Sequence, residues 1–98
     1  MREFDQPWSL SSSGGGTAVK VTGDVMEMAV YITTSSASTA TVTVQSGLTS
    51  SGPWFQEAVT SPLSTGANEV IRISGPFEWI RPFNNSTGEI TVRMIGVS

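Results

Sequence analysis

Short stretches in which apolar side chains alternate with polar ones recur along the chain. The clearest is Thr39–Gln45, in which Ala40, Val42 and Val44 alternate with Thr and Gln. Successive side chains of a β-strand point to opposite faces of the sheet, so this pattern predicts a strand with one buried face. No stretch of useful length has the period of a helix. The chain is therefore expected to be all-β.

Loops rich in Gly, Ser and Pro separate these stretches, and about seven short strands are expected. In 98 residues this spacing is typical of one small antiparallel β-sandwich, of jelly-roll or immunoglobulin-like type, or of a small barrel. The order of the strands in the sheets stays open. The expected strands are Thr17–Thr22, Val25–Ile32, Thr39–Gln45, Trp54–Val59, Glu69–Ser74, Gly75–Phe83 and Glu89–Val97.

The residues that most enzymes need are missing, because the chain contains no Cys and no His. It therefore has no cysteine nucleophile, no histidine base for a serine nucleophile, and no Cys or His metal ligand. The Glu residues fall at strand positions or strand ends that are expected to be solvated. We therefore expect no enzyme activity, no catalytic residue, no metal site and no cofactor.

The charge pattern limits the classes of partner that the chain is expected to bind. Charged residues make up only 13% of the chain, and the net charge is −3. Binding to nucleic acid needs a clustered positive face, so no nucleic-acid partner is expected. No apolar run approaches the length of a membrane-spanning helix, and no membrane partner is expected. A weakly charged surface rich in Ser and Thr tolerates contact with other proteins, and nothing indicates a small-molecule substrate.

The first 16 residues differ from the rest of the chain. They carry Phe4 and Trp8 without a visible strand or helix period, and they end in the run Ser11–Gly16. This composition predicts an extended N-terminal arm on a flexible leash (1–16), followed by a β-sandwich domain (17–98). Two alternatives are open for the aromatic side chains: they fold back on the sandwich, or they dock on a neighbouring subunit or partner.

The stretch Gly75–Phe83 is rich in aromatic residues. Phe77 and Trp79 are two residues apart and should share one face of a strand, so both are expected in the core. Trp54 follows a Gly-Pro pair at the start of a strand. It is expected to pack in the core or at its rim, with a protein interface or stacking on a sugar as alternatives.

The run Gly75-Pro76-Phe77-Glu78-Trp79-Ile80-Arg81, with the strands around it, resembles small accessory virion proteins of tailed bacteriophages. The similarity covers Val19 to Gly96. Such proteins look like capsid decoration or cement proteins, which are commonly trimers at threefold or quasi-threefold positions of the shell. The resemblance brings no catalytic residues, and it does not separate a head protein from a tail or fibre module.

The resemblance implies a non-enzymatic decoration protein that binds the outer surface of the shell of major capsid protein and stabilises it. Its expected location is the virion, and its expected state is a homotrimer. The alternative is a carbohydrate-binding or tail- or fibre-associated β-sandwich module of a virion, using Trp54 and Tyr31. The residues expected at a protein interface are Phe4, Trp8, Leu10, Leu48 and Trp54.

Overall fold

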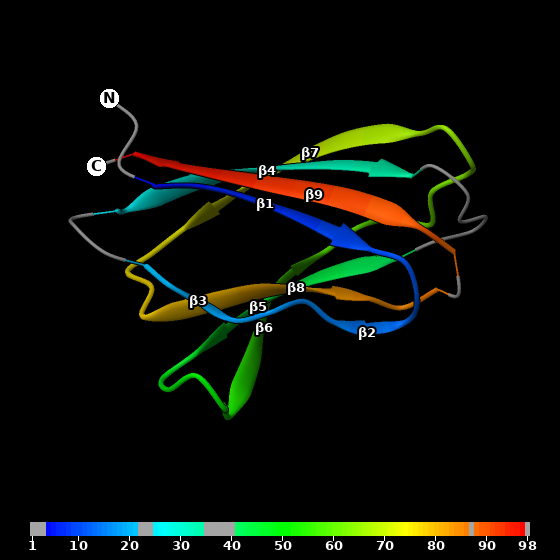
Figure 1. Cartoon of the computed structure of the whole chain (residues 1–98). Coiled ribbons are helices and arrows are strands. Elements are labelled where there is room, and N and C mark those ends of the chain that lie inside the picture. The colour runs from blue at the N-terminus through cyan, green and yellow to red at the C-terminus, as the bar shows by residue number, and fades with distance from the viewer. Residues whose placement is uncertain (1–3, 22–24, 35–40, 87, 98) are drawn as a thin grey trace.

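The computed structural model describes residues 4–21, 25–34, 41–86 and 88–97. They form two antiparallel β-sheets packed face to face, which confirms the small β-sandwich expected from the sequence (Figure 1). No helix in these ranges is long and apolar enough to cross a membrane. The strands assigned there are β1 (Phe4–Leu10), β2 (Gly14–Gly15), β3 (Val19–Lys20), β4 (Glu27–Thr34), β5 (Val42–Gly47), β6 (Trp54–Val59), β7 (Asn68–Ser74), β8 (Trp79–Asn84) and β9 (Ile90–Val97).

The strand order identifies the type of sandwich. Sheet A has the order β1-β9-β4-β7, and sheet B has the order β2-β8-β5-β6, with β3 also paired to β8. The pairs are nested along the chain: β1 with β9, β2 and β3 with β8, β4 with β7, and β5 with β6. Nested antiparallel pairs shared between two sheets are the topology of a jelly roll. Of the two sandwich types expected, the structure has the jelly roll.

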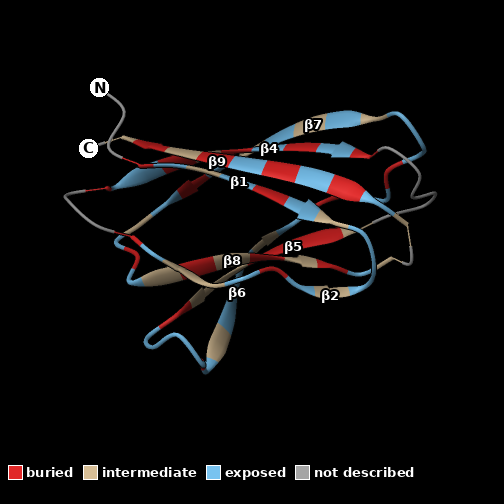
Figure 2. Ribbon diagram, in the orientation of Figure 1, coloured by how far each residue is buried: buried red, intermediate tan, exposed pale blue. Residues whose placement is uncertain are grey.

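The core lies between the sheets and follows the alternation of the sequence. In β9 the buried Ile90, Val92 and Met94 alternate with less buried residues, and Figure 2 shows the same alternation in neighbouring strands. Val42 and Val44 of β5 are fully buried, as predicted, whereas Ala40 lies outside the described residues. The buried hydrophobic residues are Phe4, Trp8, Val21, Val25, Met28, Val30, Ile32, Val42, Val44, Leu63, Ile73, Phe77, Ile80, Ile90, Val92 and Met94.

The N-terminal segment is part of the sandwich, and of the two alternatives left open for Phe4 and Trp8 the structure has the one in which they fold back on it. Residues 4–10 form β1 at the edge of sheet A, in register with β9 along their whole length. Phe4 is 9% exposed and Trp8 is 7% exposed in the chain's own core, and Leu10 packs against that core. The alternation was hidden because the polar Gln6 takes an inward position of this strand.

The expected leash, Ser11–Gly16, carries the chain from sheet A to sheet B. Part of it forms β2 on β8, and the Gly16 N–H donates a hydrogen bond of 2.8 Å to the Pro82 carbonyl. The Trp8 indole N–H donates to the Thr17 carbonyl at 2.8 Å, and a Cβ on Gly16 would lie 2.9 Å from the Trp8 ring. Glycine is needed there because the backbone lies against the indole. The domain boundary predicted after residue 16 therefore falls inside the sandwich.

Two local features change which aromatic side chains face outward. The strand expected at Gly75–Phe83 begins only at Trp79; Phe77 is buried before it, while Trp79 is half-buried on the outer face of sheet B. In β6, a register shift against β5 leaves Glu57 as an extra residue, a β-bulge. The bulge places Trp54 on the same face as Val59, which simple alternation of residues does not do.

Candidate ligand-binding face

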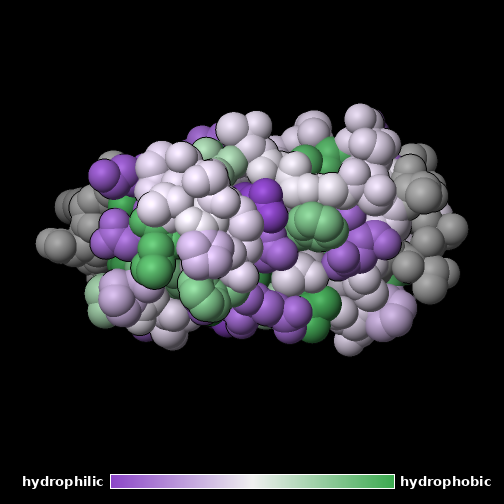
Figure 3. Space-filling view, turned by 90° about the horizontal axis from the view of Figure 1, so that it is seen from below, coloured by the Kyte–Doolittle hydropathy of each residue, from purple (hydrophilic) through white to green (hydrophobic). Residues whose placement is uncertain are grey.

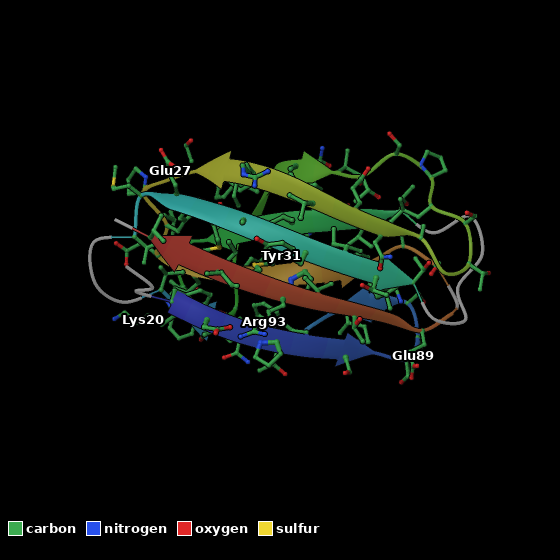
Figure 4. The ribbon with its side chains drawn as sticks, turned by 90° about the horizontal axis from the view of Figure 1, so that it is seen from above. Lys20, Glu27, Tyr31, Glu89 and Arg93 are labelled. Carbon is green, nitrogen blue, oxygen red and sulfur yellow. The ribbon has the colours of Figure 1, made fainter. Side chains whose placement is uncertain are left out.

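Tyr31 lies in the middle of the outer face of sheet A (Figure 4). Its strand, β4, runs between β9 and β7, and Tyr31 is in register with Arg93 on one side and Val70 on the other. The neighbouring Val30 and Ile32 point into the core and are fully buried. Alternation therefore turns Tyr31 outward, and its side chain is 43% exposed.

A hollow lies on each side of Tyr31. The first has a volume of about 370 Å³ and opens over Ala29, which stands in register between Ile95 and Arg72 and has too short a side chain to fill the space. The second also has a volume of about 370 Å³ and lies on the side of Val70. Tyr31 lines both hollows, so its ring forms a ridge between them. Their polar linings are Glu27, Arg72 and Ser74 in the first and Thr33, Asn68 and Glu69 in the second.

Two arginines on this face differ in their partners. Arg93 makes a two-pronged contact with Asp5 of β1, from Nε to Oδ1 at 2.8 Å and from Nη2 to Oδ2 at 2.6 Å. This hydrogen bonding, with the attraction of the carboxylate, raises the pKa of Arg93. Among the described residues no ion pair engages Arg72. Arg93 therefore contributes a neutralised, fixed pair, whereas Arg72 offers an available positive charge at the first hollow.

The polar residues beside the second hollow are Thr33, Asn68 and Glu69. Thr33 Oγ1 donates to Asn68 Oδ1 at 3.0 Å, which orients that amide. Glu69 Oε2 is buried and has no hydrogen-bond partner in the described part of the chain. A buried acceptor without a partner is unfavourable by about 1–3 kcal/mol. Glu69 is in register with the inward-pointing Ile32, so its side chain leaves the sheet on the core side and not on the Tyr31 face.

The side chains of this face are of the types that bind ligands. An aromatic ring can pack against an apolar surface of a ligand, while the guanidinium of Arg72, the carboxylate of Glu27, the amide of Asn68 and the hydroxyl groups around the ring can hydrogen-bond its polar edge. Within residues 4–21, 25–34, 41–86 and 88–97, no three Asp or Glu side chains gather as metal ligands.

The residues predicted for a protein interface lie in two different places. Phe4 and Trp8 are in the core and Leu10 packs against it, so the first two are not available on the surface of this chain. Leu48 and Trp54 lie together at one end of the β5–β6 hairpin, where Trp54 is in register with the residue before Leu48. Leu48 is 66% exposed and Trp54 is half-buried. A role of Leu48 and Trp54 in an interface stays a prediction.

Sequence reasoning named Tyr31 as a sugar contact but missed the residues that surround it. Arg72 and Ile95 reach Ala29 through the pairing of β4 with β7 and β9. The outward position of Arg72 in an alternating strand was visible in the sequence. Its neighbours were not visible, because strand pairing depends on contacts far apart in the chain.

No known family model and no curated protein sequence matches this chain. Solved structures do share its fold. The SPBc2 prophage-derived protein YomS is 21% identical with a TM-score of 0.60, and the alignment covers 97% of this chain and 96% of YomS. This similarity extends over both chains almost completely, and at this identity it shows a common fold.

Carbohydrate-binding modules have the same fold. A variant of CBM29-2, from family 29 of these modules, is 10% identical with a TM-score of 0.57, covering 95% of this chain and 81% of that one. The module CBM6cm-2 of Cellvibrio mixtus lichenase 5A, solved in complex with cellotriose, is 9% identical with a TM-score of 0.54, covering 100% and 91% of the two chains. The sandwich described above is thus shared by a prophage-derived protein and by sugar-binding modules.

Proposed function

We propose that this chain is a non-enzymatic β-sandwich module of a phage particle that binds a glycan through the Tyr31 face. The observation that carries the proposal is the position of Tyr31, an exposed ring between two hollows whose linings combine apolar and polar side chains. The C–H face of a pyranose ring is apolar and packs against an aromatic ring, while its hydroxyl groups need donors and acceptors beside that ring.

The structural neighbours support both halves of this proposal. The carbohydrate-binding modules use the same sandwich to recognise carbohydrate ligands, cellotriose in one of them. The prophage-derived protein has the same fold, and the sequence resembles accessory virion proteins. A glycan-binding module on a phage particle would add weak contacts to a sugar-coated surface, and many copies would strengthen them together.

Replacing Tyr31 with alanine is expected to weaken binding at least about tenfold, which corresponds to the loss of roughly 1.4 kcal/mol of contact energy. The measurement is affinity electrophoresis of the full chain against gels that contain β-glucan, xylan, mannan or galactan, followed by calorimetry on any positive polymer. Tyr31→Phe keeps the ring and should retain most of the affinity. Thr91→Ala, an exposed position on the same sheet face, is the matched control. Equal affinities for wild type and Tyr31→Ala would contradict the proposal.

Capsid decoration is the second candidate function, and a separate surface favours it. The β5–β6 hairpin exposes large apolar side chains: Leu48 is 66% exposed, Phe55 is 51% exposed and Val59 is 49% exposed. By the strand register, Phe55 and Val59 lie on opposite faces of β6, so exposed apolar side chains flank this edge strand on both sides. Exposed apolar residues on an edge strand are typical of a protein interface. On this hypothesis a trimer binds the major capsid protein on the outer surface of the shell. The N-terminal arm no longer supports it, since Phe4 and Trp8 are in the core.

A decoration protein should co-purify with phage particles in numbers on the order of hundreds, because a symmetric shell repeats each site many times. Quantitative mass spectrometry of purified particles measures the copy number. The double variant Leu48→Ser, Phe55→Ser should lose this association, while Tyr31→Ala should keep it. A copy number near that of tail proteins, or full occupancy by the double variant, would exclude decoration through this hairpin.

A further inference from the structure

The outer face of sheet B, opposite the Tyr31 face, combines aromatic and cationic side chains. Across this sheet Trp54, Gly47 and Trp79 stand in one row, and Lys20 of β3 follows in register with Trp79. Arg81 lies one pleat further along β8 on the same face. Figure 3 views the molecule from this side and shows strongly apolar and strongly polar residues next to one another.

Arg81 is held in a defined position. Its guanidinium carbon lies 4.2 Å from the centre of the Trp54 ring and 5.8 Å from that of Phe83. Nε donates a hydrogen bond of 2.7 Å to Gln45 Oε1. On the other side, the guanidinium lies close to Gly15, where an added Cβ would be 2.7 Å from Nη1 and would displace it. Stacking, one hydrogen bond and this close approach therefore orient the group before any ligand binds.

No carboxylate neutralises Arg81 in the described part of the chain, in contrast to Arg93 with its partner Asp5. The Gln45 side chain accepts a hydrogen bond only from Nε, so Nη1 and Nη2 have no hydrogen-bond acceptor among the described residues. Partial burial lowers the pKa of Arg81, because its charged form loses contact with water; a guanidinium nevertheless stays charged in proteins. An oriented guanidinium whose two terminal nitrogens are unsatisfied fits the two oxygens of a carboxylate.

We propose that this face docks on an acidic segment of a partner protein, whose Asp or Glu carboxylate binds Nη1 and Nη2 of Arg81. The positive charges of Arg81 and Lys20 supply the charge complementarity. Trp and Arg are the residue types that contribute most to protein interfaces, and Leu48 lies beside this face as an exposed apolar contact. The guanidinium of Arg81 covers a face of the Trp54 ring, which makes this ring a poor platform for stacking a sugar.

The test uses the full chain labelled with ¹⁵N and follows the Arg Nε–H and Trp indole signals. The probe is a tetraglutamate peptide, and its control is the tetraglutamine peptide of the same length. Tetraglutamate is expected to shift the signals of Arg81 and Trp54, to leave Arg93 unchanged, and to bind more weakly as salt is added. Tetraglutamine is expected to shift neither signal.

Variants at the two arginines complete the test. Arg81→Gln should abolish the response, and Arg81→Lys should weaken it at least about tenfold, because an ammonium group cannot make the paired contact. Arg93→Gln, which removes an arginine already paired with Asp5, should leave the response intact, and so should Tyr31→Ala. No shift at Arg81, or equal shifts with the two peptides, would overturn the proposal. Tighter binding of oligogalacturonate than of tetraglutamate would assign the site to an acidic sugar instead.

Discussion

Replacing Trp8 with alanine is expected to lower the free energy of unfolding by about 3–5 kcal/mol, the usual range for truncating a large buried aromatic side chain. Trp8 is 7% exposed in the core, and its indole N–H donates to the Thr17 carbonyl at 2.8 Å. The substitution removes the packing of β1 on the core and leaves that carbonyl without its donor. For a small domain with a total stability of roughly 5–15 kcal/mol, the loss is large.

Urea denaturation of the wild type and the variant measures the effect. Ser9→Ala is the matched control, since Ser9 is the next residue of β1 and is exposed on the opposite face of the strand; its unfolding free energy should stay within about 0.5 kcal/mol of wild type. A Trp8→Ala variant as stable as the control would mean that β1 does not pack on its own sandwich in solution. That result would restore the N-terminal segment as an arm for a neighbouring molecule.

Replacing the fully buried Asn84 with leucine is expected to lower the free energy of unfolding by about 2–3 kcal/mol. Its Nδ2 donates to the carbonyls of Gly88 at 2.9 Å and Ser12 at 3.2 Å. Its Oδ1 accepts from the backbone N–H of Ser86 at 2.9 Å and from the Ser86 hydroxyl at 2.7 Å. One amide therefore joins the end of β8, the turn before β9 and the segment around Ser12 that connects sheet A to sheet B. Leucine keeps the volume and removes all of these bonds.

The adjacent Asn85 provides a matched control for this second experiment. Its side chain makes a hydrogen bond of 2.9 Å to Thr43 Oγ1, and the residue is exposed. Asn85→Ala should therefore change the free energy of unfolding by less than about 1 kcal/mol. Thermal and urea unfolding of both variants give the comparison. Similar values for the two would show that the Asn84 network adds no stability beyond that of the single hydrogen bond of Asn85.

The strands themselves were largely predictable from the sequence. Val42 and Val44 of β5 are buried as alternation predicted, and the strand expected at Glu89–Val97 is β9. Two strands depart from simple alternation of apolar and polar residues, each for a local reason. Gln6 takes an inward position in β1, and the bulge at Glu57 reverses the faces of the residues that follow it in β6.

The candidate sites were less predictable than the strands. Tyr31 could be singled out as an outward aromatic residue in an alternating strand. Trp79 was expected in the core and faces outward, because its strand begins two residues after Phe77 and the intervening turn changes the phase. Arg81, held by Trp54 and Gln45 from two other strands, became a candidate only when those strands were seen paired.

The sequence by itself determined that the chain is all-β, because alternation is a local property that each segment carries independently. It also determined that histidine and cysteine chemistry are absent. The tertiary structure decided that β1 belongs to the sandwich, that the strands nest as a jelly roll, and that Tyr31 and Arg81 lie on opposite outer faces. These features depend on pairing between segments as distant as Phe4 and Gly96, and on the space that Ala29 and Gly15 leave open. Local patterns contain no information on such pairing, because it is selected by the packing of the whole core.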